Sequence, residues 1–243
     1  MDTVLITGVS GGIGGACCEE FLRKGYSVIG ISRNTTEVCK KWKNGAFHGI
    51  DYDLARIDGL KKLIKEIVDT YGSVRGFVHC AGFDKMTPLS IAKPELMEDL
   101  WRIHAQVPML ITSYLGKKGC YSKDMSIVLI SSQSAHEGAM GHAAYASAKG
   151  AIEGFLAPAA AELMEKGIRI NILSFAPVKT GMAEGWMDKL TPDMRKKTEE
   201  SYPIGIMEAD EASKYISFLI SEESKYINGQ IITVDGGHMV RKP

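Results

Sequence analysis

The chain has 243 residues, of which 45% are hydrophobic and 24% are charged, as expected of a globular protein. Its 29 basic and 29 acidic residues give a formal net charge of zero, which disfavours nucleic acid and anionic membrane surfaces as partners. No apolar run approaches the ~18 residues that a membrane span needs. The five cysteines are an odd number without zinc-finger spacing, so we expect reduced thiols in a cytoplasmic protein.

The beginning of the chain has the pattern of a strand, a glycine-rich turn, a helix and a second strand. We predict the strands at 3–7 and 27–31 and the helix at 12–24. A unit of this length implies a right-handed crossover between parallel strands. Glycines let backbone approach a ligand, and a helix N-terminus offers free N–H groups to phosphate, which favours a dinucleotide site over a simple tight turn. The predicted contacts are Gly8, Ser10, Gly11, Gly12, Ile13 and Gly14.

The second strand ends at Ser32 and Arg33, where the choice of cofactor is made in such units. An acidic residue there would bind the ribose hydroxyls of NAD, whereas an arginine can hold the 2′-phosphate of NADP. Because no Asp or Glu stands beside Arg33, we predict NADP(H) in preference to NAD(H). The alternative is a solvated loop arginine.

Strands and helices continue to alternate along the rest of the chain. We predict strands at 47–50, 76–79, 126–130, 168–173 and 231–234, and helices at 60–71, within 90–114 and at 141–166. The strands are apolar on both faces, which is typical of a parallel sheet covered by helices on each side. Since no break in composition or repeat interrupts the pattern, we predict one α/β domain over 1–243. Its fold is a Rossmann-type, doubly wound, seven-stranded parallel sheet.

Small and polar residues follow several of these strands, although they come from distant parts of the sequence. They are the glycine turn, Arg33, Asp53, Cys80, Ala81, Gly82, Ser132 and Pro177. In an open parallel sheet, ligands bind beyond the carboxyl ends of the strands. We therefore expect these residues to converge on one site.

Tyr145 and Lys149 are four residues apart and share one face of the predicted helix 141–166. A phenol loses its proton near pH ~10, and a neighbouring ammonium lowers that value. Such a pair can exchange a proton near neutral pH, as general acid–base catalysis requires. The alternative is an ordinary pair on a solvated helix face.

With these residues in place, the chain resembles the short-chain dehydrogenases/reductases, particularly the 3-oxoacyl-carrier-protein reductases. The motif Thr7-Gly8-x-x-x-Gly12-Ile13-Gly14 matches the family's cofactor turn. Ser132 stands thirteen residues before Tyr145, and Lys149 four after it, as in the family's catalytic set. The end of the chain also matches, with Val234-Asp235-Gly236-Gly237, so that the resemblance extends over the whole sequence.

The resemblance implies an interconversion of a carbonyl and a secondary alcohol, in which a nicotinamide cofactor carries the hydride. Tyr145 would exchange a proton with the substrate oxygen. Lys149 would lower the pKa of Tyr145 and hold the nicotinamide ribose, and Ser132 would orient the substrate oxygen. Further cofactor contacts would come from Asp53, Leu54, Cys80, Ala81, Gly82, Pro177, Val178 and Thr180.

The chain departs from the family pattern at three places, one of which is the loop 176–182, shorter by two residues and without the usual Gly. His79 and Cys80 replace two asparagines, so we expect the side-chain bonds that hold the neighbouring strands there to be lost. His104 replaces an asparagine that supports a proton-relaying water. Pro108 has no N–H, so the carbonyl of His104 is expected to be free to accept from water. Our hypothesis is a relay through that carbonyl with the ring as support, and the alternative is a packed histidine without proton traffic.

The expected substrate pocket combines residues after the strand 126–130 with a lid at about 181–202. Its candidate residues are Gln133, Ser134, His136, His142, Met182 and Trp186; for those of the lid, the alternative is that they only pack the lid helix on the body. The histidines have no recognisable zinc spacing, and we expect no metal. By resemblance we expect a homotetramer or homodimer. Three functions stay open: an NADP(H)-dependent carbonyl reductase, a sugar or nucleotide-sugar oxidoreductase, and a non-catalytic NADP-binding regulatory protein.

Overall fold

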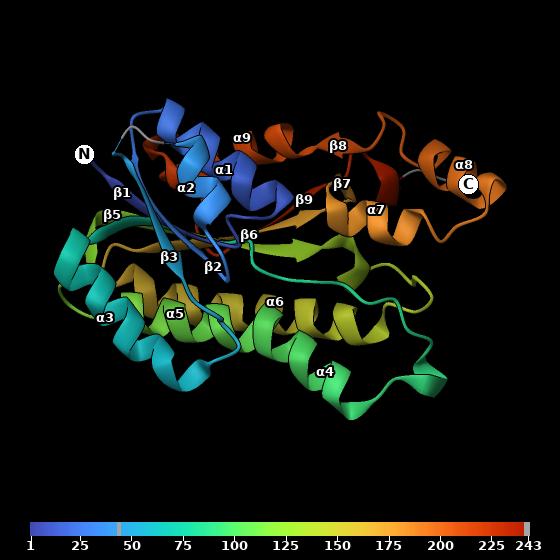
Figure 1. Cartoon of the computed structure of the whole chain (residues 1–243), viewed down its shortest axis with the longest axis horizontal. Coiled ribbons are helices and arrows are strands. Elements are labelled where there is room, and N and C mark those ends of the chain that lie inside the picture. The colour runs from blue at the N-terminus through green and yellow to red at the C-terminus, as the bar shows by residue number, and fades with distance from the viewer. Residues whose placement is uncertain (43–44, 241–243) are drawn as a thin grey trace.

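Seven parallel strands form the main sheet, in the order β3-β2-β1-β4-β5-β6-β9 (Figure 1). The computed structural model describes residues 1–42 and 45–240, and every count below refers to these residues. The strands are β1 (Thr3–Thr7), β2 (Ser27–Ser32), β3 (Phe47–Asp51), β4 (Val74–His79), β5 (Tyr121–Ser132), β6 (Arg169–Phe175) and β9 (Ile231–Val234). The order reverses between β1 and β4, where a doubly wound sheet opens a crevice. The predicted Rossmann-type fold is confirmed, while 43–44 and 241–243 of the predicted domain 1–243 lie outside the described residues.

Strand β1 lies inside the sheet, between β2 and β4, and is buried along its whole length. Its last residue, Thr7, pairs with Ile31 of β2 on one side and with His79 of β4 on the other. Successive side chains point to opposite faces of a strand, so Leu5 enters one hydrophobic core while Val4 and Ile6 enter the other. This explains why the strand is an unbroken apolar run in the sequence.

One face of the sheet is covered by α3 (Leu60–Tyr71), α5 (Val107–Leu115) and α6 (Ala143–Met164), which lie below it in Figure 1. Helix α3 shows why such a segment packs there. Its buried residues recur at the helical spacing of three and four, so one stripe meets the sheet: Leu60, Leu63, Ile64 and Ile67.

The opposite face is covered by α1 (Gly12–Arg23) and α9 (Ala209–Ile220), with α2 (Thr36–Lys41) beside them (Figure 1). Helix α9 was not among the predicted elements. The sequence does carry its signal, because Glu208 and Glu211 form a capping box at its start. Its buried apolar positions, Ala212, Ile216, Leu219 and Ile220, follow at helical spacing.

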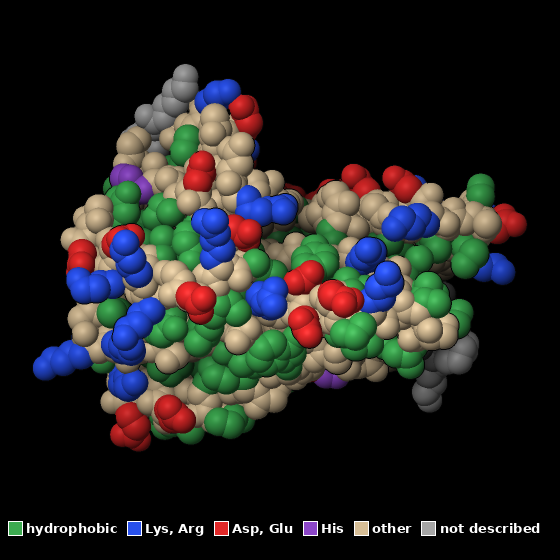
Figure 2. Space-filling model, turned by 60° about the horizontal axis from the view of Figure 1, so that its bottom comes forward, with side chains coloured by type: hydrophobic (Ala, Val, Ile, Leu, Met, Phe, Trp, Pro, Cys, Tyr) green, Lys and Arg blue, Asp and Glu red, His purple; other side chains and the backbone are tan. Residues whose placement is uncertain are grey.

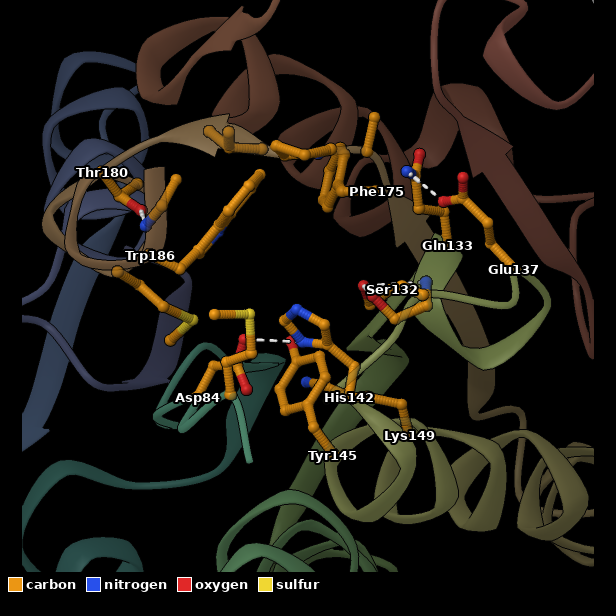
Figure 3. A pocket seen from close by; sticks show the side chains of 18 of the residues that line it. Asp84, Ser132, Gln133, Glu137, His142, Tyr145, Lys149, Phe175, Thr180 and Trp186 are labelled. Carbon is orange, nitrogen blue, oxygen red and sulfur yellow. Dashed lines mark hydrogen bonds and ion pairs between the residues drawn. The ribbon is translucent and has the colours of Figure 1, made fainter. Parts of the chain in front are cut away.

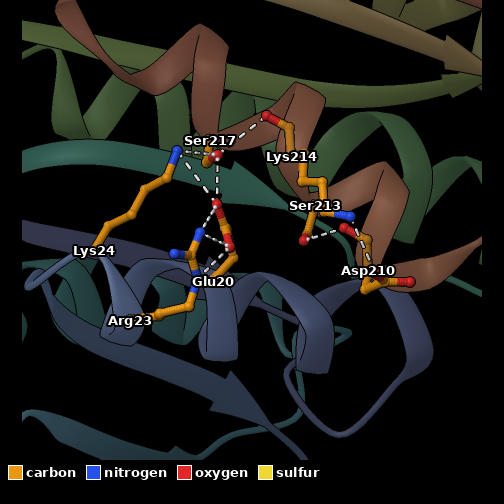
Figure 4. A network of polar contacts seen from close by, with 7 residues as sticks. All are labelled: Glu20, Arg23, Lys24, Asp210, Ser213, Lys214 and Ser217. Atoms are coloured by element: carbon orange, nitrogen blue, oxygen red, sulfur yellow. Dashed lines mark hydrogen bonds and ion pairs between the residues drawn. The ribbon is translucent and has the colours of Figure 1, made fainter.

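A polar network joins α1 to α9 within this layer (Figure 4). The Glu20 side chain is 9% exposed and accepts hydrogen bonds from Arg23. Lys24 lies 3.3 Å from the same carboxylate and donates to Ser217 on α9 across 2.9 Å. Burial opposes ionisation of Glu20, but the bonds from Arg23 and Lys24 hold its pKa below the usual value. A paired carboxylate can thus be tolerated between two helices.

The single long helix expected within 90–114 is interrupted in the structure. Helix α4 (Pro94–Trp101) is followed by a π-helical turn at Arg102–Gln106 and then by α5. Within this turn, the N–H of Val107 bonds to the carbonyl of Arg102, five residues back. The next residue, Pro108, has no N–H to continue the ladder, so we attribute the widened turn to this proline.

The expected lid consists of two short helices, α7 (Gly181–Met187) and α8 (Pro192–Glu200), which project at one end of the molecule (Figure 1). A small parallel sheet of β7 (Val178–Lys179) and β8 (Met207–Glu208) closes the segment at its base. Thr180 and Thr191 accept N-capping bonds at the starts of these helices. The surface turned forward in Figure 2 carries acidic and basic side chains side by side, in keeping with the zero net charge.

Candidate active site

The glycine turn after β1 is shaped by close backbone contacts. Gly8 has φ +75°, and a Cβ there would lie 2.7 Å from the backbone of Ala81. A Cβ on Gly14 would lie 2.2 Å from the carbonyl oxygen of Gly8. The first turn of α1 carries no acidic side chain, and its N-cap, Gly11, makes no side-chain capping bond. The free N–H groups at this helix N-terminus therefore fit the phosphates of a dinucleotide.

The loop after β2 is held by contacts that the sequence did not reveal. Asp51 at the end of β3 accepts two bonds from Thr35, from its N–H and from its hydroxyl, each 2.7 Å long. The hydroxyls of Ser10 and Ser32 lie 2.5 Å apart, which joins the glycine turn to the same loop. Arg33 projects from this tethered loop into solvent, where a 2′-phosphate could reach it.

Asp53 and Leu54 follow β3 and have different surroundings. Leu54 is buried in the core, whereas the carboxylate of Asp53 is exposed and accepts from the N–H of Ala55. These two residues, predicted as cofactor contacts, form a turn directly after β3.

His79 supplies strand-to-strand bonds of its own, contrary to the expected loss. Its Nδ1 lies 2.8 Å from the hydroxyl of Thr7, and its Nε2 lies 3.0 Å from the carbonyl of Ile103. We assign the proton to Nε2, since a carbonyl can only accept. Burial lowers the pKa of His79 to about 3, and the charge of Lys149 acts in the same direction. This neutral histidine ties β4 to β1 and to the π-helical turn.

The three residues of the predicted catalytic set line one cavity of about 730 Å³ beyond the ends of β4, β5 and β6 (Figure 3). Ser132 is the last residue of β5, and its hydroxyl accepts from the N–H of Ser134. Tyr145 and Lys149 project from successive turns at the start of α6. The ammonium of Lys149 donates to the carbonyl of Ile130 across 2.7 Å and lies 5.6 Å from the ring centroid of Tyr145.

The electrostatics of this set differ from the expectation that Lys149 lowers the pKa of Tyr145. Burial raises the pKa of Tyr145 above its usual value, and the carboxylate of Asp84 adds to the rise, while a hydrogen bond with Ser132 opposes it. Burial also lowers the pKa of Lys149 to about 8. The protein's own groups therefore favour the neutral phenol, the form that can donate a proton to a carbonyl oxygen.

His104 lies against Tyr145 within the same cavity. Its Nε2 is 2.6 Å from the carbonyl oxygen of Phe83, so we assign the ring proton to this nitrogen; the N–H of Phe83 approaches it less closely, at 3.3 Å. Nδ1 then has a free lone pair and no partner among the described residues. Burial lowers the pKa of His104 well below its usual value, and the charge of Lys149 adds to this, so the ring is neutral.

The predicted pocket residues separate into two groups. The cavity is lined by the substrate candidates Gln133, Ser134, His142, Met182 and Trp186, and by the cofactor candidates Ile13, Cys80, Ala81, Gly82, Pro177, Val178 and Thr180. His136 does not line it, because its ring turns away to Glu153 on α6, 2.9 Å distant. Glu153 also accepts from the hydroxyl of Ser131, so this buried carboxylate anchors the loop after β5 to α6.

Asp84 is a pocket residue that sequence reasoning missed. Its side chain is 8% exposed, and its Oδ2 lies 3.0 Å from Nδ1 of His142 (Figure 3). This contact raises the pKa of His142 above its usual value. The two residues are 58 positions apart in sequence, so no local pattern could have paired them.

A second set of polar side chains, also lining the cavity, is linked by hydrogen bonds and stacking. The amide nitrogen of Gln133 donates to the hydroxyl of Tyr202 and to the carboxylate of Glu137. His238, near the end of the described chain, lies 3.1 Å from that carboxylate and stacks on Tyr202 with ring centroids 4.4 Å apart. Neither Tyr202 nor His238 was among the predicted site residues. No cluster of possible metal ligands occurs among the described residues.

Comparisons with known proteins bear on this site. A family model described as enoyl-(acyl carrier protein) reductase matches residues 8–239. The uncharacterized oxidoreductase YmfI of Bacillus subtilis (strain 168) is 30% identical, covering 97% of this chain and 98% of its own. The 3-oxoacyl-[acyl-carrier-protein] reductase FabG of Thermotoga maritima is 28% identical, covering 97% of each chain.

Solved structures share the fold over nearly the whole length. The aldohexose dehydrogenase AldT of Thermoplasma acidophilum, in ligand-free form, is 25% identical with a TM-score of 0.87 over 100% of this chain and 95% of its own. ElxO with NADP bound has a TM-score of 0.87 at 24% identity over 99% of each chain. The 4-hydroxyisoleucine dehydrogenase complexed with NADH has a TM-score of 0.91 at 23% identity over 100% of each chain.

Proposed function

The chain belongs to the short-chain dehydrogenase/reductase family and is an NAD(P)-dependent oxidoreductase, and we propose that it reduces a small carbonyl compound with NADPH or oxidises the matching secondary alcohol. The observation that carries the proposal is the meeting of Ser132, Tyr145 and Lys149 in one cavity beside the glycine turn. A nicotinamide ring bound there supplies the hydride.

The proposed role of each residue follows from its position in the cavity. Tyr145 donates its phenol proton to the substrate oxygen during reduction and takes it back during oxidation. The hydroxyl of Ser132 donates a hydrogen bond to the same oxygen and orients it. Lys149, whose ammonium is already anchored by the carbonyl of Ile130, holds the nicotinamide ribose and supports the charge that develops on Tyr145.

The NADP(H) preference is supported by Arg33, which projects from the loop tethered by Thr35 and Asp51. A guanidinium there matches the geometry and charge of a 2′-phosphate. The structural relatives named above include proteins with NADP and with NADH bound, so the preference rests on this chain's own arginine.

The proposed lid, 181–202, covers the cavity from one side with Met182 and Trp186. Its α7 begins directly after Thr180, whose methyl group faces Gly12 of the cofactor turn. This contact supports a lid whose position depends on the cofactor turn.

We also propose that the protein is a homotetramer or homodimer in the cytoplasm. Apolar side chains that are exposed around α4, such as Leu89, Ile91 and Trp101, support association of copies. Ala157 and Ala161 are exposed on one face of α6 and would permit close helix packing. The five free cysteines support a reducing compartment. None of the helices within the described residues combines the length and hydrophobicity needed to cross a bilayer.

A sugar oxidoreductase is the second candidate, because the pocket wall carries the Asp84–His142 pair beside Tyr145. The regulatory alternative is disfavoured by the intact catalytic set.

The decisive experiment measures NADPH and NADH binding to the purified protein and then the consumption of NADPH with ketones, 3-oxoacyl thioesters and keto-sugars. We expect turnover that falls by about 10²- to 10⁴-fold in Tyr145→Phe while NADPH still binds. Tyr215→Phe, on the exposed side of α9, is the matched control. Binding of neither NADPH nor NADH would refute the proposal.

A further inference from the structure

Asp84 is placed in the cavity by contacts of the loop that carries it. The N–H of Thr87 donates to the carbonyl of Gly141 across 2.8 Å. Gly141 has φ +83°, and a Cβ there would lie 2.7 Å from the side chain of Met86. The loop after β4 is thus packed against the residues that open α6. This packing brings the carboxylate of Asp84 beside the ring of His142.

The two oxygens of the Asp84 carboxylate have different surroundings, since only Oδ2 is in ion-pair contact with His142. Oδ2 lies 3.0 Å from Nδ1 of His142, whereas Oδ1 is buried and has no hydrogen-bond partner among the described residues. A buried carboxylate oxygen without a donor is unfavourable unless a ligand or water supplies one. Oδ1 therefore needs a donor that no described residue supplies, on a side chain that lines the cavity.

His142 contributes the opposite function at the same place. Its Nδ1 faces Asp84, and the other ring nitrogen, Nε2, points to the open centre of the cavity in Figure 3. The neighbouring carboxylate favours the protonated ring, in which both nitrogens carry a hydrogen. Nε2–H is then a donor directed into the cavity, on the ring that contacts the carboxylate with the unpaired oxygen.

The ring and the carboxylate that touch each other thus supply one donor and one acceptor, which match a hydroxyl group, because a hydroxyl both donates and accepts. A ketone or thioester oxygen would accept from His142 but leave Oδ1 of Asp84 without a donor. A methylene group would satisfy neither atom. The rings of His142 and Tyr145 are 6.4 Å apart between centroids, so the group that they recognise lies close to the reacting carbon.

Two more polar atoms of the same cavity also require donors. The amide nitrogen of Gln133 is used by Glu137 and Tyr202, and its Oε1 is buried without a partner among the described residues. The free lone pair on Nδ1 of His104 has no donor either. Three residues that line the cavity thus carry buried, unpaired acceptors, which suits a substrate with several O–H groups.

We propose that the substrate carries a hydroxyl on the carbon beside its reacting carbonyl, and that Asp84 and His142 bind this hydroxyl. The substrate class is thus an α-hydroxy ketone, or a vicinal diol in the oxidative direction. This inference rests on the proposed function, and it separates the chain from reductases whose substrates have a methylene at that position.

The kinetic test compares 2-hydroxycyclohexanone with cyclohexanone, two ketones that differ by this hydroxyl. We expect the native enzyme to prefer the hydroxy ketone by at least tenfold in kcat/KM, and Asp84→Ala to reduce that ratio to near one. Asp99→Ala removes an exposed carboxylate from α4 and should keep the native ratio. Equal efficiency on both ketones, or an unchanged ratio in Asp84→Ala, would overturn the inference and leave the proposed reductase in place.

A binding test does not depend on turnover. Calorimetry in the presence of NADP⁺ compares trans-1,2-cyclohexanediol with cyclohexanol. We expect the diol to bind at least tenfold more tightly to the native protein, and this advantage to disappear in Asp84→Ala. Preferential diol binding without reduction of either ketone would contradict the proposed function but support the hydroxyl site. No preference for the diol would overturn the hydroxyl site itself.

Discussion

The ring of His104 meets the ring of Tyr145 edge-on, with centroids 5.0 Å apart and planes at 86°. On its other side the His104 ring contacts Gly82, where a Cβ would lie only 2.2 Å from Cε1. The ring is thus confined between the cofactor loop and the proposed acid. We propose that the ring positions Tyr145, whatever the backbone carbonyl of His104 contributes to proton transfer.

His104→Ala is therefore expected to lower kcat by about tenfold. Without the ring, Tyr145 is held less well for proton transfer, which slows turnover more than it weakens binding. The affinity for NADPH should change little. Because His104 is neutral through the working range, the shape of the pH profile of kcat should be retained. Stopped-flow kinetics from pH 6 to 9 would test this, with His48→Ala in β3 as the control. Undiminished turnover would remove the ring from the mechanism. Complete loss with an intact fold would contradict a relay through the backbone carbonyl.

Gly12→Ala is expected to weaken NADPH binding by about tenfold while the protein still folds. The new Cβ would lie 2.3 Å from Cγ2 of Thr180, so Thr180, the N-cap of α7, must move. Gly15→Ala is the matched control, because its Cβ would lie 3.5 Å from the nearest atom, an ordinary contact. Alanine in that helix interior should stabilise the protein by about 0.5–1 kcal/mol. Equal NADPH affinities in the two variants would disprove the coupling between the glycine turn and α7.

Arg33→Asp is expected to reverse the cofactor preference. The carboxylate would repel a 2′-phosphate and accept from the ribose hydroxyls of NADH. We expect the ratio of the two dissociation constants to change by at least about tenfold, the effect of losing ~1.4 kcal/mol. Fluorescence titration with both cofactors would measure it, and Arg56→Asp, another exposed arginine in a nearby turn, is the control. A native enzyme that binds NADH more tightly would contradict the NADP(H) proposal.

Acid should destabilise the protein through His79. The pKa of this buried ring is lowered to about 3, whereas an unfolded histidine titrates near ~6.5. Between these pH values the unfolded chain binds one more proton than the folded chain. The contribution of His79 to the free energy of unfolding is therefore fully present above pH ~6.5 and falls by up to ~1.4 kcal/mol for each pH unit below it. His104 acts in the same direction.

Urea unfolding at pH 7, 6 and 5 would measure this loss of stability. In His79→Asn, the free energy of unfolding should fall less steeply with pH, because one titrating group is missing. Asparagine retains a donor and an acceptor for Thr7 and Ile103, so the variant is designed to fold. The same pH dependence in both proteins would show that His79 does not carry it.

The sequence predicted the sheet well because its strands are apolar runs bounded by glycine and polar residues. Strands β1 and β9 and helix α3 have the expected bounds. Strand β5 begins at Tyr121, five residues before the prediction, because its first residues are polar and partly exposed. The sequence predicted that the carbonyl of His104 would lack its helix partner before Pro108, but it did not predict the π-helical turn. The shape of a helix around a proline depends on how the helix packs.

The site was predictable where function requires backbone approach or a recurrent spacing, as at Gly8 and at Tyr145 with Lys149. It was not predictable where a partner comes from far along the chain. Asp84 meets His142, and His136 turns to Glu153, only because separate loops pack together. The raised pKa of Tyr145 likewise follows from burial, which no pair spacing reveals.

The contact between α1 and α9 sets the order in which this protein can complete itself during synthesis. Lys24 and Ser217 are 193 residues apart, yet they share one buried carboxylate, that of Glu20 (Figure 4). Until residue 220 has left the ribosome, the side of α1 that meets α9, with its buried glutamate, lacks this partner. The nucleotide-binding half is thus the first to be made and among the last to be finished, which favours slow folding and a need for protection while the chain grows.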